Sequence, residues 1–150
     1  MNESKDFFHN PPAAGQAPLH ITDEAEACAA VLFACLRANE LDGMTENRIV
    51  DTIVSSRNIF QGTDGAALIE RCGQYYAQAG SPAALIDAAI GAIREQTRLP
   101  LFFNCLDVIL SDGIVTPAEH KIFQYLRGKF KVEDELAWKG MEVLVAKNQL

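Results

Sequence analysis

Hydrophobic residues recur along most of this chain every three to four positions, the spacing that places them on one face of an α-helix. Such stripes run through residues 49–54, 68–76, 85–93, 122–130 and 136–145. Two other segments, 25–36 and 98–110, are apolar nearly all round, which predicts helices buried on several sides. The β-branched residues follow the helical spacing, so no β-strand is predicted.

Capping residues mark where several of these helices start. The predicted starts are Asp23 with Glu26, Thr63 or Asp64, Ser81-Pro82, and Thr116-Pro117-Ala118-Glu119. The last is the strongest because it combines a capping residue, a proline in the first turn and a glutamate at the third position. The first helix is predicted to end near Asp42-Gly43, and the second is predicted to begin at about Thr45.

Together these patterns predict an all-α protein, a single-domain helical bundle of about seven helices over residues 21–150. Residues 1–20 differ from the rest because they are polar, contain three prolines and show no apolar periodicity. They are therefore predicted to form a flexible N-terminal tail.

Composition restricts the partners and the compartment. A net charge of −7 without a basic stripe argues against a nucleic-acid partner. The longest apolar run, 99–110, is shorter than the roughly 20 residues of a membrane span, so no direct membrane insertion is expected. The N-terminus lacks the pattern of a signal peptide, and the four cysteines form no C-x-x-C pair. A cytoplasmic protein with reduced thiols is predicted.

The two most apolar helices resemble each other in sequence. Residues 31–36 match residues 101–106 at an offset of 70, and Asp42-Gly43 matches Asp112-Gly113 at the same offset. Each half is then predicted to consist of a buried helix, an Asp-Gly turn and an amphipathic helix. Because one half alone cannot cover its apolar helix, we predict an internal duplication in which the halves pack about a pseudo-twofold axis.

Residues 105–119 run from the apolar helix through Asp112-Gly113 to Glu119 at the start of an amphipathic helix. This pattern resembles the tellurite-resistance TerB-like family, and the resemblance extends over about residues 23–148. It implies a duplicated helical bundle with an acidic cluster that binds a divalent metal ion. It also implies a cytoplasmic protein of the tellurite and chemical-stress response that acts with protein partners, some of them membrane-associated.

The positions that match the acidic cluster of that family are Asp42, Asp112, Glu119 and Glu46. Glu46 is the weaker match, because it follows its aspartate by four residues whereas Glu119 follows Asp112 by seven. An alternative alignment puts Arg48 in its place. Carboxylates held close together repel, and a cation would relieve that repulsion. Oxygen ligands favour calcium or magnesium over zinc.

The same residues also have a purely structural interpretation. Asp42 and Asp112 suit turns that precede glycine, and Glu119 suits a capping box at the start of its helix. A calcium EF-hand is excluded, because its earlier ligand positions would fall on the apolar residues Val108 and Leu110.

No motif of a nucleophilic, phosphate-binding or metalloprotease site occurs, and Cys35 and Cys105 are expected to be buried. The sequence therefore favours a protein without enzymatic activity. One hypothesis is a stress-response module that binds a divalent cation. The other is a protein–protein interaction module whose acidic turns are structural. A metal-dependent hydrolase is a disfavoured third class, and the oligomeric state is left open.

Overall fold

The computed structural model describes residues 19–39, 43–111 and 115–150, with the backbone alone described for 43–47. These residues form seven α-helices and one 3-10 turn, with no β-strand among them, which confirms the predicted all-α bundle. The helices are α2 (Glu24–Ala38), α3 (Gly43–Ser56), α4 (Gly65–Ala79), α5 (Pro82–Ile90), α6 (Glu95–Ile109), α7 (Pro117–Phe130) and α8 (Asp134–Lys147), and the 3-10 turn is η1 (Asn58–Phe60).

Side chains cap the helices where the sequence predicts that they start. Each accepts a hydrogen bond from a backbone N–H of the first turn, which would otherwise have no partner inside the helix. The pairs are Asp23 with Glu26 at 3.0 Å, Asp64 with Ala66 at 3.1 Å, Ser81 with Ala84 at 3.2 Å and Thr116 with Glu119 at 3.1 Å. The predicted starts are confirmed, with Asp64 rather than Thr63 as the cap of α4.

The prediction for the end of the first helix is wrong. α2 ends at Ala38 with Asn39 as its C-cap, and Gly43 is the first residue of α3 rather than a terminator of α2. The physical reason is that the apolar pattern stops at Ala38, and the amide of Asn39 then donates a hydrogen bond to the carbonyl of Val108 in α6. Asp42, the other residue of the predicted turn, lies outside the described residues.

Two further boundaries differ from prediction. The helix predicted over residues 85–93 is α5, and it ends at Ile90. Ile93 therefore lies beyond it, although Ile93 is still buried. α6 begins at Glu95 instead of Arg98, and Pro100 lies inside it. At the N-terminal side, Leu19 of the predicted tail packs against the core, while residues 1–18 lie outside the described part of the chain.

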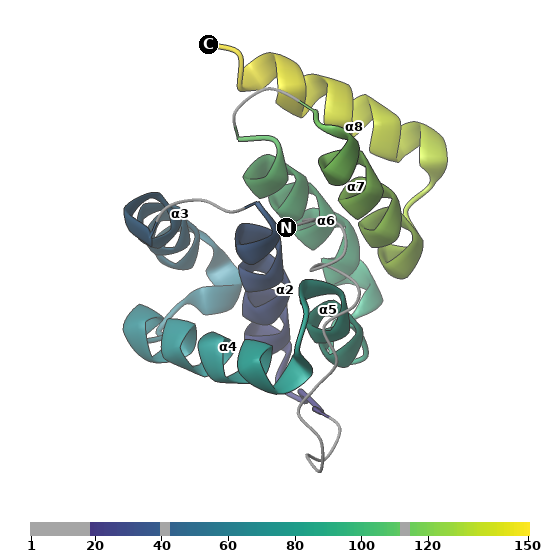
Figure 1. The fold of residues 1–150 in the computed structure, drawn as a ribbon. Coiled ribbons are helices and arrows are strands. Elements are labelled where there is room, and N and C mark those ends of the chain that lie inside the picture. The colour runs from purple at the N-terminus through teal and green to yellow at the C-terminus, as the bar shows by residue number, and fades with distance from the viewer. Residues whose placement is uncertain (1–18, 40–42, 112–114) are drawn as a thin grey trace.

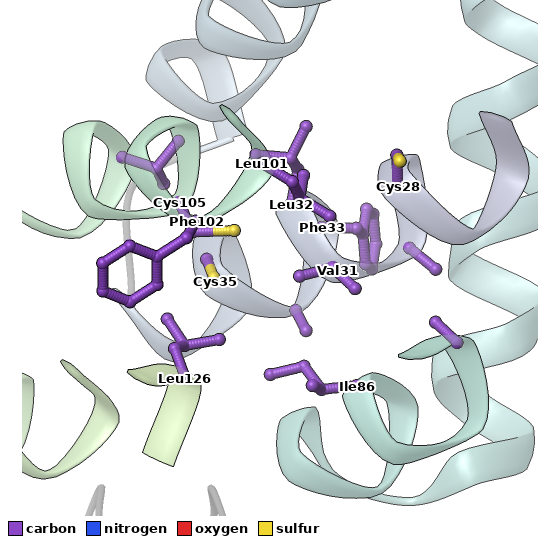
Figure 2. Packing of buried hydrophobic residues seen from close by; sticks show 14 of the residues in the cluster. Cys28, Val31, Leu32, Phe33, Cys35, Ile86, Leu101, Phe102, Cys105 and Leu126 are labelled. Atoms are coloured by element: carbon purple, nitrogen blue, oxygen red, sulfur yellow. The ribbon is translucent and has the colours of Figure 1, made fainter. Parts of the chain in front are cut away.

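The core is built around α2 and α6. α2 packs against α4, α5 and α6, while α7 and α8 pack on α6 and α3 packs on α4 (Figure 1). Every residue from Ala27 to Leu36 is buried, as predicted for a helix that is apolar all round. Figure 2 shows this packing, in which Leu32 of α2 lies near Leu101 of α6 and Cys35 lies near Cys105.

A glycine lets α8 approach α6 closely. A β-carbon placed at Gly140 would lie 2.0 Å from an edge atom of the Phe103 ring, far inside van der Waals contact. The ring of Phe103 is itself packed edge-on against Phe102, with ring centroids 5.4 Å apart. The spacing of the two helices therefore depends on the absence of a side chain at position 140.

We predict that Gly140→Ala lowers the free energy of unfolding by about 1–3 kcal/mol, because the new methyl group forces the Phe103 ring or α8 to move. Chemical denaturation measures this loss. The matched control is Gly73→Ala in α4, where nothing lies within 4 Å of the added β-carbon. There alanine should stabilise the helix by about 0.5–1 kcal/mol. Equal effects at the two positions would contradict the proposed close approach.

Candidate functional site

The helices α2 and α6 run side by side in the same direction (Figure 1). The start of α2 contacts the start of α6 through Glu24 and Arg94, and the end of α2 contacts the end of α6 through Asn39 and Val108. The first pair is separated by 70 residues in sequence and the second by 69. The contacts between the helices thus follow the offset at which their sequences match.

A charged pair joins the N-terminal ends. The carboxylate of Glu24 accepts hydrogen bonds from the Arg94 backbone N–H at 2.8 Å and from its Nε at 3.0 Å. The side-chain hydrogen bond from Arg94, together with the backbone one, lowers the pKa of Glu24 below its ordinary value of 4.5. Arg94 also precedes the first residue of α6, so the pair fixes the point at which this helix begins.

Two thiols meet further along the same helices. Cys35 and Cys105, also 70 residues apart, are fully buried, and Figure 2 shows both sulfur atoms within the apolar core. Burial raises the pKa of Cys105 well above its ordinary value, and a side-chain hydrogen bond with Cys35 raises it further. Their predicted burial is confirmed.

Side-chain amides of two asparagines join the C-terminal ends of these helices. Asn39 Nδ2 donates to the Val108 carbonyl at 3.1 Å, and Asn148 Nδ2 donates to the Leu110 carbonyl at 3.0 Å. These bonds satisfy the carbonyl groups of Val108, in the last turn of α6, and of its C-cap Leu110, which have no partner within the helix. The ends of α2, α6 and α8 are consequently held together at one end of the bundle.

The side chains of three of the four predicted metal ligands lie outside the described residues. Asp42 and Asp112 lie outside the described residues, and Glu46 lies in the first turn of α3 with its side chain outside them. Within the described part of the chain, no group of three or more His, Cys, Asp or Glu residues is arranged to hold a metal ion.

Glu119 is the one predicted ligand whose side chain is described. It is buried, with 7% of its surface exposed. Its Oε1 accepts a hydrogen bond from the Thr116 backbone N–H at 2.9 Å, and Thr116 Oγ1 accepts one from the Glu119 N–H. This reciprocal pair is the capping box that the sequence predicts, and the negative charge also suits the positive end of the α7 dipole. Its role as a metal ligand stays a prediction.

A polar groove that the sequence did not reveal lies between α3, α6 and α8. Its volume is about 390 Å³, and its lining is a mixture of charged, amide and hydroxyl side chains with three apolar ones. The residues that line this α3–α6–α8 groove are Arg48, Ile49, Thr52, Ile53, Ser56, Arg57, Asn104, Asp107, Val108, Ser111, Lys147 and Asn148.

The three helices that form this groove are far apart in sequence, so no local motif marks it. One feature of the sequence could have indicated the groove. Arg48, Thr52 and Ser56 recur every four residues and form a polar stripe on α3 beside its apolar one.

No helix among the residues described is both long enough and apolar enough to cross a membrane. Comparison of the chain with protein-family models, with curated proteins and with solved structures finds no match.

We predict that Glu24→Gln destabilises the protein at neutral pH and that this loss shrinks in acid. The folded-state pKa of Glu24 lies below 4.5, so its contribution is fully present above that pH and disappears as the pH falls through the folded-state pKa. Urea denaturation of both proteins between pH 3 and 7 measures the difference. The control is Glu142→Gln on the exposed face of α8. A pH-independent difference for Glu24→Gln would contradict the pairing with Arg94.

We also predict that none of the four thiols reacts in the folded protein. All four cysteines are buried, and burial raises the pKa of Cys28 and of Cys72 to about 12, so the reactive thiolate is scarce at neutral pH. Ellman's reagent should label no thiol in native buffer over a period that labels glutathione completely, and four in guanidinium chloride. Rapid labelling of one thiol in native buffer would show that the core is open at that cysteine.

Proposed function

We propose that this chain is a non-enzymatic module that binds a divalent cation, calcium or magnesium, at the C-terminal ends of α2 and α6. Asp42 and Asp112 are its principal ligands, and Glu46 and Glu119 are further candidates. The resemblance to the TerB-like family is the reason to associate such a module with the tellurite and chemical-stress response, together with protein partners.

The observation that carries the proposal is the hydrogen bond from Asn39 to Val108, which joins the two helix ends at 3.1 Å. Asp42 follows Asn39 by three residues, and Asp112 follows Leu110 by two. An extended chain spans at most about 3.6 Å per residue, so segments of three and two residues reach at most about 11 Å and about 7 Å from these helix ends. The parallel direction of the two helices supports a site that both aspartates share at one end of the bundle.

An internal duplication is part of the same proposal. If a pseudo-twofold axis runs between parallel helices, residues near the axis contact their own equivalents in the other half. Glu24 with Arg94 and Cys35 with Cys105 are such pairs, because each is separated by the repeat offset of 70. An antiparallel pair would place equivalent residues together only at the crossing point. The parallel arrangement thus supports two related halves with two related acidic turns.

Glu119 ranks below the aspartates as a ligand. One of its carboxylate oxygens already accepts the capping hydrogen bond from Thr116, and the side chain is buried. A bound cation would have to share this carboxylate with the start of α7. Such sharing is compatible with calcium, which accepts six to eight oxygen ligands in irregular geometry, and less so with magnesium, which requires a near-ideal octahedron.

A second candidate function is a protein–protein interaction module without a metal. The capping role of Glu119 favours it, because this carboxylate has a structural task that is independent of any ion. Two large apolar side chains on α8, Val143 at 66% and Leu136 at 41% exposure, also favour it. In this alternative the two aspartates serve only as turn residues.

Metal titration separates the two functions. We predict that calcium or magnesium binds the wild-type protein in isothermal titration calorimetry. A free concentration about 100 times the dissociation constant should then add about 2.7 kcal/mol to the free energy of unfolding. The double variant Asp42→Asn/Asp112→Asn should lose both effects, because a carboxamide offers one neutral oxygen where the carboxylate offers two charged ones.

The matched control is Asp51→Asn/Glu142→Gln, which changes the net charge by the same amount at two exposed residues. It should keep metal binding within about twofold of wild type. If calcium, magnesium, manganese and zinc all leave the heat signal and the melting temperature of the wild-type protein unchanged, the metal proposal is wrong and the interaction module is favoured. Equal losses in both double variants would show a diffuse charge effect instead of a site.

A further inference from the structure

The α3–α6–α8 groove has a charge opposite to that of the whole protein. Among its lining residues the cations are Arg48, Arg57 and Lys147, and the carboxylate is Asp107. Lys147 Nζ pairs with Asp107 Oδ1 at 3.0 Å, so these two charges largely cancel. Two positive charges remain in the groove of a chain whose net charge is −7. A concave surface with one sign of charge concentrates oppositely charged ligands.

A hydrogen bond holds the side chain of Arg57 in a fixed orientation. Its Nε donates to Asn104 Oδ1 at 2.9 Å, and Asn104 Nδ2 in turn donates to the Pro100 carbonyl at 2.8 Å. The plane of the guanidinium is thereby fixed against α6, while its two terminal nitrogens have no partner among the residues that the structure describes. A guanidinium with paired terminal N–H groups matches the geometry of a carboxylate or a phosphate.

The wall of the groove that α8 forms is fixed as well. Asp107 accepts hydrogen bonds from Lys147 at 3.0 Å and from Asn148 at 3.3 Å, which anchors the end of α8 to α6. Asn148 also donates to the Leu110 carbonyl. A groove whose walls are already tied together loses little conformational freedom when a ligand enters.

The remaining polar side chains show which kind of ligand fits. Thr52 Oγ1 donates its one hydrogen to the Arg48 carbonyl at 2.9 Å, and Ser56 Oγ donates its hydrogen to the Thr52 carbonyl at 2.6 Å. Both hydroxyls can therefore only accept further hydrogen bonds. The guanidinium of Arg48 has no hydrogen-bond or ion-pair partner among the described residues. The donors that remain for a ligand are thus chiefly guanidinium groups, which select an acceptor with negative charge.

We propose that this groove binds a small molecule that carries a phosphate or a carboxylate group. Arg57 holds the oxyanion, and Arg48, nine residues earlier on the same wall, adds a second positive charge. The volume of about 390 Å³ is in the range of small-molecule sites, roughly 300–1,000 Å³, and exceeds what a bare ion needs. The body of the ligand would lie against Ile49, Ile53 and Val108 and donate hydrogen bonds to Thr52 and Ser56.

The experiment is a pair of titrations followed by ¹⁵N NMR, one with inorganic phosphate and one with citrate, at constant ionic strength. The buffer is stripped of metal ions over a chelating resin, so that binding does not depend on the proposed cation site. Saturable shifts of the side-chain Nε–H signals of Arg57 and Arg48 are expected with at least one of the two probes. Phosphate alone would assign a phosphate ligand, citrate alone a carboxylate ligand, and both the shared oxyanion chemistry.

Arg48→Gln/Arg57→Gln should weaken this binding at least about tenfold, which corresponds to about 1.4 kcal/mol. Arg48→Gln alone removes no hydrogen bond between described side chains and should give a smaller loss in the same direction. The control, Lys121→Gln/Lys139→Gln, removes two positive charges outside the groove and should bind within about twofold of wild type. The proposal is overturned if neither probe gives saturable shifts, or if the control loses as much affinity as the groove variant.

Discussion

The parallel pairing of α2 and α6 is the interaction on which the rest of the molecule depends. Both helices are apolar on several sides, so each needs cover from several neighbours. α4 and α5 cover much of α2, α7 and α8 cover part of α6, and the contact between α2 and α6 joins these two groups of helices. Apolar contacts alone would let the two helices slide along each other. Hydrogen bonds at both ends prevent this, between Glu24 and Arg94 at one end and between Asn39 and Val108 at the other.

The same pairing creates the two places where a ligand is proposed to bind. Because the helices are parallel, both of their C-terminal ends lie at one end of the bundle, next to the end of α8. The proposed cation ligands Asp42 and Asp112 follow these ends in sequence, and Arg48 of the α3–α6–α8 groove belongs to α3. In this proposal a cation and an oxyanion have separate ligands, carboxylates for the first and guanidinium groups for the second.

Much of this fold could be predicted from sequence, because its signals are local. Asp23, Ser81 and Thr116 satisfy backbone N–H groups within four residues of themselves, and the apolar stripes show which face each helix buries. The end of α2 could not be predicted in this way. Asn39 ends that helix while bonded to Val108, a partner 69 residues away that only the tertiary structure supplies. The groove was missed for the same reason, since Arg57, Asn104 and Lys147 belong to three different walls.

The most direct test of the parallel pairing is a nuclear Overhauser experiment on isotope-labelled protein. Parallel helices should give cross-peaks between the side-chain amide of Asn39 and the backbone protons around Val108, and between the β-protons of Cys35 and Cys105. Cross-peaks that connect Asn39 with the start of α6 near Arg94 would mean that the helices are antiparallel. The two acidic turns would then lie at opposite ends of the bundle, and the account would be wrong at its base.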